Sequence, residues 1–282
     1  MKRSLSAGVA LVCLLAVAGC FKHREAPHRP VTAASISDAV AKKDTVERLN
    51  LAGQSVGALP QELAAMPKLK ELWLRDGKEV GSLAVLPSLK ALRTLDLSAV
   101  GLASVPAEVF AVPALEQLYL TGNGIAALPS AVGAMKSLAY LNLDRNQLSA
   151  VPAEVGSLAE LRWLRLNENK LAALPSELGG LKKLQRIYLR QNQFAAVPEC
   201  LKGLPALEDI SLSGNRIEEL PAWLTELPKL RSLDFDNNPV KKLPERLDGW
   251  SKLQVLSLVR CPLDEAERAR IRKALPKTHI AF

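Results

Sequence analysis

An aliphatic residue recurs along this chain with a fixed step. A Leu, or a Val once, stands at every 23rd position from residue 46 to residue 253. The unit that begins at Leu161 shows the pattern LxxLxLxxNxLxxLPxxLxxLxx in full. Ten units in unbroken register predict a repeat architecture, because self-similarity at a short fixed period is typical of solenoids.

The two halves of each unit carry different periods. In the LxL segment apolar and polar residues alternate, which is typical of a half-buried strand. In the second half apolar residues recur every three to four positions, as in a helical turn. One unit cannot bury its leucines alone, but stacked units share a core and place parallel strands about 4.8 Å apart. We therefore predict an α/β solenoid of about ten repeats.

This pattern resembles the leucine-rich repeat family, in its 23-residue LPxxL variety. The resemblance covers residues 46–263. It implies a horseshoe whose parallel β-sheet forms the concave face, with a short helical cap at each end. A fold of this kind does not define a function, so the function has to be argued from the variable side chains.

Asparagine follows the strand segment in six of the units. The chain must turn sharply there, and a side-chain amide can both donate to and accept from the backbone groups of the turn. In the family such residues form a ladder, so we assign a structural role to Asn123, Asn146, Asn169, Asn192, Asn215 and Asn238. Val100 takes this place in the third unit, where the turn must be satisfied otherwise. We also expect an irregular loop around residues 75–84.

Positions 3, 5 and 7 of each unit face away from the core, on the sheet surface. All three tyrosines of the protein and two of its four tryptophans occupy these positions. Four consecutive units gather what we call the aromatic–arginine patch: Tyr119, Tyr140, Trp163, Arg165, Arg186, Tyr188 and Arg190. Tyr, Trp and Arg dominate the energetics of protein interfaces, so the patch predicts a site for another protein. The alternative is that aromatic side chains pair across strands and only stabilise the sheet.

Two other kinds of site are open to the same surface. Trp73, Tyr140 and Trp163 would stack on sugar rings in a glycan-binding or peptidoglycan-binding envelope protein. Asp209, Asp234 and Asp236 form an acidic zone, which is either a solvated rim or, as an alternative, a calcium site.

We expect no enzyme activity, cofactor or metal. The sequence has no Ser/His/Asp set and no glycine-rich phosphate loop. Two of its three histidines, His23 and His28, precede the repeats, and His279 lies near the C-terminus. Residues 264–282 are too few to form a catalytic domain.

The net charge of +8 is modest. Removal of residues 1–19 would take away Lys2 and Arg3 and no acidic residue, which leaves +6. Nucleic-acid binders concentrate basic residues in one run or face, and no basic run occurs in the sequence. We therefore expect no nucleic-acid partner and at most a weak attraction to anionic surfaces.

The N-terminus has the order of a secretion signal. Lys2 and Arg3 precede an apolar stretch over residues 7–18, which is too short to span a bilayer. The residues Val-Ala-Gly-Cys at 17–20 resemble the lipobox of bacterial lipoproteins. This resemblance implies that residues 1–19 are removed and that Cys20 carries the acyl chains. Plain cleavage and an uncleaved anchor are the alternatives.

Several acyl chains together hold a protein stably on a membrane. Because Phe21 rather than Asp follows the cysteine, the family rule directs the protein to the outer membrane of a Gram-negative bacterium, facing the periplasm or the exterior. Residues 20–34, with two prolines and mixed charge, predict a flexible tether. We expect a monomer.

Both ends of the repeat array carry capping signals. Ser35-x-x-Asp38 predicts a short helix within an N-terminal cap over residues 35–45, with Ile36, Ala39 and Val40 facing the core. Asp264-x-x-Glu267 predicts a second helix within a C-terminal cap over residues 264–282. Its Ile271, Ala274 and Leu275 would cover the last unit, followed by a short strand.

Cys200 and Cys261 lie three units apart. Three strand spacings come to about 14 Å, which exceeds the roughly 7 Å limit between the Cα atoms of a disulfide. We predict two free thiols.

Overall fold

The computed structural model describes residues 29–78 and 80–282. The chain divides into two compact units, Met1–Pro30 and Val31–Phe282, and all repeats lie in the second. The predicted signal peptide, Cys20 and the tether up to residue 28 lie outside the described residues.

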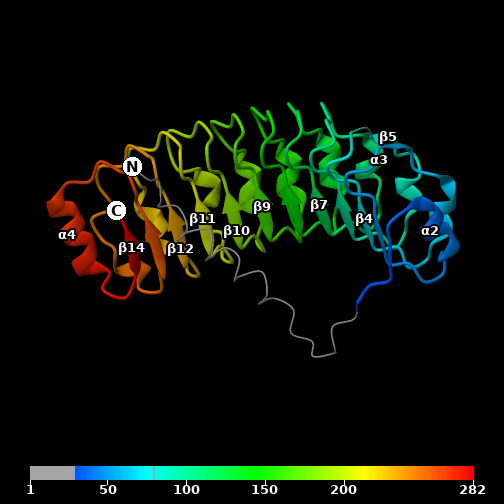
Figure 1. Ribbon diagram of the computed structural model, residues 1–282. Coiled ribbons are helices and arrows are strands. Elements are labelled where there is room, and N and C mark those ends of the chain that lie inside the picture. Colours follow the sequence, from blue (N-terminus) through cyan, green and yellow to red (C-terminus); the bar gives the residue numbers. More distant parts are fainter. Residues whose placement is uncertain (1–28, 79) are drawn as a thin grey trace, which may run out of the picture. The chain divides into compact units, whose positions relative to one another are not determined.

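The repeats stack into one parallel sheet of 12 strands, in which the strand order follows the chain (Figure 1). Each repeat gives positions 3–5 to the sheet, so paired residues such as Trp163 and Arg186 are 23 apart in sequence. This confirms the predicted solenoid with a parallel sheet. The strands are β1 (Thr32–Ala33), β2 (Arg48–Asn50), β4 (Glu71–Trp73), β6 (Thr94–Asp96), β7 (Gln117–Tyr119), β8 (Tyr140–Asn142), β9 (Trp163–Arg165), β10 (Arg186–Tyr188), β11 (Asp209–Ser211), β12 (Ser232–Asp234), β13 (Val255–Ser257) and β14 (His279–Ala281).

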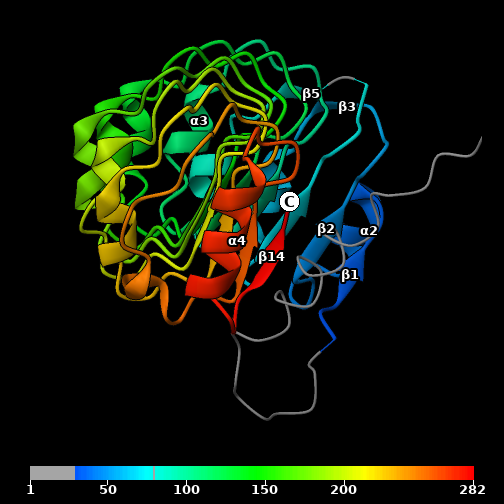
Figure 2. The same ribbon diagram turned by 90° about the vertical axis from the view of Figure 1, so that its left-hand side faces the viewer.

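Short helices occupy the side of the solenoid opposite the sheet, as the view along its length shows (Figure 2). Most begin directly after the proline of the LPxxL segment, which is their N-cap residue with extended backbone. They are α3 (Ala107–Phe110) and the 3₁₀ helices Gln61–Ala65, Leu86–Ser88, Ser130–Ala134, Ala153–Ser157, Ser176–Gly180, Glu199–Leu201, Ala222–Glu226 and Asp248–Trp250.

The core between sheet and helices is a column of aliphatic layers. Leu161, Leu164 and Leu166 are all fully buried, and the equivalent residues of the other units are buried as well. Full burial of one such side chain contributes about 1.5–3 kcal/mol. Each layer touches only its neighbours, so the core is continuous along the solenoid.

The expected irregular loop around residues 75–84 is instead partly a strand. β5 (Val80–Ser82) pairs in parallel with β3 (Val56–Ala58) as a separate two-stranded sheet. Val56 pairs with Val80, so the paired residues are 24 positions apart, one more than the repeat length of 23. A Cβ atom on Gly81 would lie 1.3 Å from the carbonyl oxygen of Gly57, and only glycine allows this approach.

The N-terminal cap begins earlier than the sequence indicated. Thr32–Ala33, which we assigned to the tether, forms β1, and Ala33 is fully buried. The following helix α2 (Ile36–Ala41) is capped by the Ser35 hydroxyl, which accepts from the backbone N–H of Asp38. Val40 is 38% exposed, contrary to expectation, because the short helix turns only the stripe around Ala39 inward.

The C-terminal cap consists of α4 (Glu265–Ala274) and β14. The Asp264 carboxylate caps α4 by accepting from the N–H of Glu267. Ile271 and Leu275 are buried, whereas Ala274 is exposed, contrary to expectation. Residues spaced four apart share the inward face of a helix, and Ala274 lies outside that stripe.

Cys200 and Cys261 are both free thiols. Across residues 29–78 and 80–282, no helix has the length and apolar character needed to cross a bilayer.

Candidate functional site

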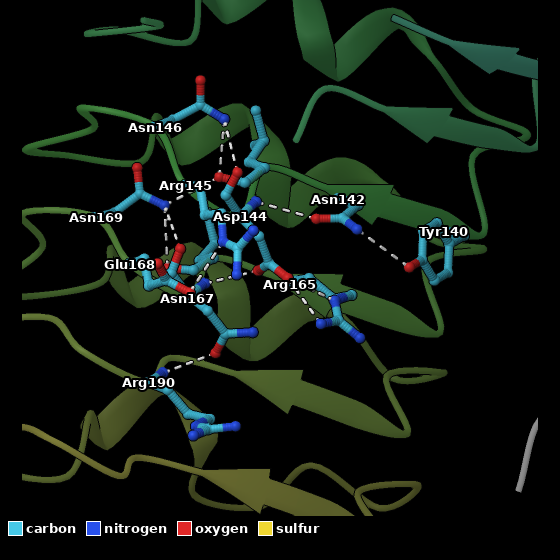
Figure 3. A network of polar contacts seen from close by, with 12 residues as sticks. Tyr140, Asn142, Asp144, Arg145, Asn146, Arg165, Asn167, Glu168, Asn169 and Arg190 are labelled. Atoms are coloured by element: carbon cyan, nitrogen blue, oxygen red, sulfur yellow. Dashed lines mark hydrogen bonds and ion pairs between the residues drawn. The ribbon is translucent and has the colours of Figure 1, made fainter. Parts of the chain in front are cut away.

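The six asparagines tie neighbouring repeats together. Asn169 is typical, since its Oδ1 accepts from the N–H of Leu148 at 3.0 Å. Its Nδ2 donates to the carbonyls of Leu143 and Leu166 at 2.9 and 3.1 Å (Figure 3). The other five make the same three bonds with the same sequence offsets. All six side chains are 2–8% exposed, so they face no ligand.

Units that lack this asparagine satisfy the turn differently. In the unit of Val100, Asn123 of the next unit accepts from the N–H groups of both Val100 and Leu102, at 3.2 and 3.0 Å. At the other end, the Cys261 thiol donates to the carbonyl of Phe235 at 3.3 Å, the bond that asparagine makes elsewhere.

The aromatic–arginine patch contains a continuous stack of side chains. The ring centroids of Tyr119 and Tyr140 are 4.8 Å apart, and those of Tyr140 and Trp163 are 5.7 Å apart. The Arg186 guanidinium lies 4.5 Å from the Trp163 ring and pairs with Asp209 at 2.9 Å. The stack therefore crosses five neighbouring strands, from β7 to β11, without interruption.

A second row runs beside this stack. Arg165 lies 5.1 Å from the ring of Tyr188 and forms an ion pair with Asp144 at 2.7 Å. Arg190 is exposed, and its backbone N–H donates to Asn167 Oδ1 at 2.8 Å (Figure 3). Among the described residues, the Arg190 guanidinium makes no ion pair. It is thus the cation of the patch that is not held in an ion pair, although its charge opposes the raised pKa of Asp234.

Arginine pairing within the patch went unnoticed in the sequence, although the repeat indicates it. Arg186 and Asp209 are 23 residues apart, and so are Arg48 and Glu71, which pair at 2.7 Å between β2 and β4. Residues one period apart sit on adjacent strands at the same position. Opposite charges at that spacing therefore predict a cross-strand ion pair.

Side chains at position 7 are less available to a partner than their place on the sheet surface suggested, because several of them bind the backbone of the next repeat. Asp144 Oδ1 accepts from the N–H of Asn167, and Asp236 Oδ1 accepts from the N–H of Val259, both at 2.8 Å. Asp144 and Asn167 are only 7% exposed. These side chains form a second polar ladder beside the sheet, because the backbone N–H groups beyond each strand need partners.

The carboxylates of the acidic zone are half-buried and are held by neighbouring serine and arginine side chains. Asp234 accepts from the Ser211 hydroxyl at 2.7 Å, and Asp236 accepts from the Ser257 hydroxyl at 2.6 Å. Burial raises the pKa of Asp209, which Arg186 opposes, and burial also raises the pKa of Asp234. Within the described part of the chain, no three His, Cys, Asp or Glu side chains are grouped as metal ligands.

The tryptophan of the second unit belongs to a separate cluster. The guanidinium groups of Arg48 and Arg75 lie 4.3 and 5.4 Å from the centre of the Trp73 ring. Its strand β4 is three strands away from β8, which carries Tyr140. The three aromatic residues of the glycan hypothesis therefore do not form one platform, and only Tyr140 and Trp163 lie together.

Burial and the neighbouring Tyr140 hydroxyl raise the pKa of Tyr119 to about 12. Burial also raises the pKa of Tyr140, although Arg165 opposes the shift. Both phenols are therefore neutral at physiological pH. The Tyr119 hydroxyl donates to Gln117 Oε1 at 3.1 Å, and the Tyr140 hydroxyl accepts from Asn142 Nδ2 at 3.4 Å.

The Leucine rich repeat family profile matches residues 90–148, 136–194, 159–217 and 196–240. Together these matches cover residues 90–240, more than half of the chain. A search of curated proteins gave no match.

Several solved structures are similar to this chain. The leucine-rich repeat protein LIC12759 of Leptospira interrogans is 29% identical, with a TM-score of 0.59 over 89% of this chain and 75% of that one. An internalin, InlF of Listeria monocytogenes, is 23% identical, with a TM-score of 0.73 over 88% and 70%. The ectodomain of the Arabidopsis receptor kinase HAESA, solved with the IDA peptide hormone, is 30% identical, with a TM-score of 0.64 over 78% of this chain but only 38% of its own.

Proposed function

Because the chain belongs to the leucine-rich repeat family, we propose that it is a non-catalytic scaffold that binds another protein through the aromatic–arginine patch. The observation that carries this proposal is the unbroken stack from Tyr119 to Arg186 on the sheet face. Aromatic and arginine side chains concentrated at the centre of a surface are typical of the residues that dominate binding energy.

The packing of the patch supports binding energetically. The Arg186 side chain is only 16% exposed, because Trp163 and Asp209 hold it. Ordering a free side chain at an interface costs about 0.5–1.5 kcal/mol, and a side chain that is already held loses less. The patch is thus preorganised for a partner.

Charge indicates what that partner offers. Arg165 and Arg186 are neutralised by Asp144 and Asp209, which leaves Arg190 as the exposed cation beside the rings. A partner with an apolar segment and a nearby carboxylate would complement this arrangement. The HAESA ectodomain, which is similar in fold, binds a peptide hormone, and this supports a protein or peptide ligand here.

We also propose that the protein is a lipoprotein, anchored by acyl chains on Cys20 in the outer membrane of a Gram-negative bacterium. The support is the Val-Ala-Gly-Cys sequence at residues 17–20 after a basic and apolar segment. Metabolic labelling with a palmitate analogue tests this: the wild-type chain should be labelled and Cys20→Ser should not. Equal labelling of the two chains would contradict acylation at Cys20.

The binding surface is tested by Trp163→Ala combined with Arg186→Ala. We expect the double variant to lose capture of its partner from envelope extract, because the centre of the stack is removed. A matched control, Ser232→Ala with Val255→Ala, changes position 3 of two units outside the patch and should retain capture. Thermal unfolding of both variants verifies that the solenoid stays folded.

Capture that persists in the Trp163/Arg186 variant at wild-type level would contradict the proposal. Purified peptidoglycan provides the second arm of the experiment. Binding to peptidoglycan that depends on Trp163, without any protein partner, would favour the glycan function instead.

A further inference from the structure

Basic side chains accumulate at the edge of the sheet where the strands begin. We count the first leucine of each unit as position 1 and define the strand-start edge as positions 22, 23 and 2. In the ten units this edge carries eleven Lys or Arg against four Asp or Glu. The basic residues are Lys68, Lys70, Lys90, Arg93, Lys136, Arg162, Lys182, Lys183, Lys229, Arg231 and Lys252.

The backbone shows that these residues form one continuous edge. The N–H of Lys70 donates to the carbonyl of Glu47, and the N–H of Arg93 donates to the carbonyl of Lys70, both at 2.8 Å. The same bond joins each later pair of position-2 residues up to Gln254 and Arg231. Ten units at strand spacing make this edge roughly 43 Å long.

Most of the charge on the strand-start edge is not neutralised by the protein. Lys70, Arg93 and Lys183 pair with glutamates of adjacent units. The other eight cations make no ion pair with any described residue, and all eight are exposed. The helix side has the opposite balance, since positions 15–20 of units 1–9 carry eight acidic and two basic residues.

The chain enters the solenoid at this same edge. The carbonyl of Val31 accepts from the N–H of Glu47 at 2.9 Å, so Val31 extends the row of position-2 residues. Everything that precedes Val31, including the apolar stretch over residues 7–18, is joined covalently at the basic edge.

We propose that the strand-start edge lies against an anionic phospholipid surface. The orientation rests on the proposed membrane attachment through the N-terminus, while the lipid contact rests on the charge of the edge. A row of exposed cations close to a negative membrane surface is attracted to it, and the attraction falls off within a Debye length. The strands then stand on the membrane and the aromatic–arginine patch opens sideways, where a partner can reach it.

The test uses the full chain on extruded vesicles of phosphatidylcholine alone or with 30% phosphatidylglycerol. Lysine acetylation read by mass spectrometry reports which side chains the bilayer covers. We expect Lys136, Lys229 and Lys252 to be protected several-fold on the anionic vesicles at low salt, and exposed again in 0.5 M NaCl. Lys170, Lys241 and Lys242 lie at positions 10, 12 and 13, which follow the strand and which we call the strand-end edge. They are the internal control and should react equally on both vesicles.

Charge variants provide the second measurement. Changing Lys136, Lys229 and Lys252 to Gln should lower the preference for anionic over neutral vesicles by about fivefold per charge at low salt. The matched triple of Lys170, Lys241 and Lys242 to Gln removes the same charge from the other edge and should change the preference little. All six side chains are exposed, so the fold should tolerate either set.

Equal protection of both lysine sets, or equal effects of the two triples, would overturn the proposal, because net charge alone would then explain binding. Preferential binding of a short DNA duplex at the same lysines would overturn it in favour of a general polyanion site. A chain that fails to sediment with neutral vesicles would contradict the N-terminal anchor. The lysine protection on anionic vesicles would still show whether the strand-start edge contacts the lipid.

Discussion

At the residue scale, the solenoid depends on side chains that complete the backbone hydrogen bonding. Each asparagine of the ladder serves a turn in its own unit and a turn in the unit before it. The buried N–H and carbonyl groups at these turns have no other strand to pair with, and leaving such a group unpaired costs about 1–3 kcal/mol. The ladder is therefore part of the core, although its members are polar.

Replacing Asn169 by Ala should destabilise the protein by about 1–3 kcal/mol, because the N–H of Leu148 loses its amide partner, whereas the carbonyl of Leu143 keeps the amide of Asn146. Urea unfolding measures the effect. Lys170→Ala changes the exposed neighbour and should stay within about 0.5 kcal/mol of wild type. A loss of similar size in both variants would contradict the structural role of Asn169.

Alkaline pH should destabilise the fold through Tyr119. Its pKa is about 12 in the folded protein, mainly through burial, and about 10 in an unfolded chain. Above pH 10 the unfolded state loses the phenolic proton while the folded state keeps it. Stability that is fully present below pH 10 is therefore lost as the pH rises toward 12.

The measurement is unfolding in urea at pH 9 and pH 11, together with phenolate absorbance. Tyr119→Phe should show a smaller loss of stability between the two pH values than the wild type. The phenolate absorbance that Tyr119 contributes should appear only near pH 12. A wild-type protein whose three tyrosines all titrate near pH 10 would contradict the buried stack.

At the element scale, each repeat has a residue with left-handed backbone conformation three positions after the end of its strand. This residue is always position 8, and it is Gly in three units but Ala99, Arg145 or Glu168 in others, with φ between 53° and 57°. A residue with a Cβ atom in this region is strained, whereas glycine is not. The turn geometry is therefore imposed by the stack of repeats and not by local preference.

Ala99→Gly should stabilise the protein by about 0.5–1 kcal/mol, because it removes the strain at φ +53°. Ala172→Gly is the control, since residue 172 is exposed and its φ is not positive. It should be neutral or destabilising by up to about 1 kcal/mol. Chemical denaturation of both variants decides the sign, and a destabilising Ala99→Gly would show that the turn is not strained.

The elements themselves could be predicted because the repeat sets both period and register. Leu164 and Trp163 were assigned to opposite faces from alternation alone, and the structure buries the first and leaves the second on the sheet surface. The paired strand at Val80–Ser82 was missed, because its partner is offset by 24 residues and leaves the regular pattern. Asp144 was missed as a structural group, because its backbone partner belongs to the next unit.

At the scale of the whole molecule, the repeat converts sequence positions 23 apart into continuous surfaces. The absence of a basic run led us to expect at most a weak attraction to anionic surfaces, yet lysines and arginines spaced one period apart form the strand-start edge. Counting charge by repeat position would have revealed it. In the same way the patch, the acidic helix side and the basic edge follow from three different sets of positions.

The central claim is that a partner protein binds one of these surfaces, the sheet face that carries the aromatic–arginine patch. A photocrosslinking residue replaces Tyr188 in the patch or Ser176 on the helix side, one variant at a time, and adducts are identified by mass spectrometry in intact cells. The account predicts one protein adduct from position 188, lost when Trp163 and Arg186 are changed to Ala, and none from position 176. Adducts of equal yield from both positions, or an adduct at 188 that survives the double change, would contradict it.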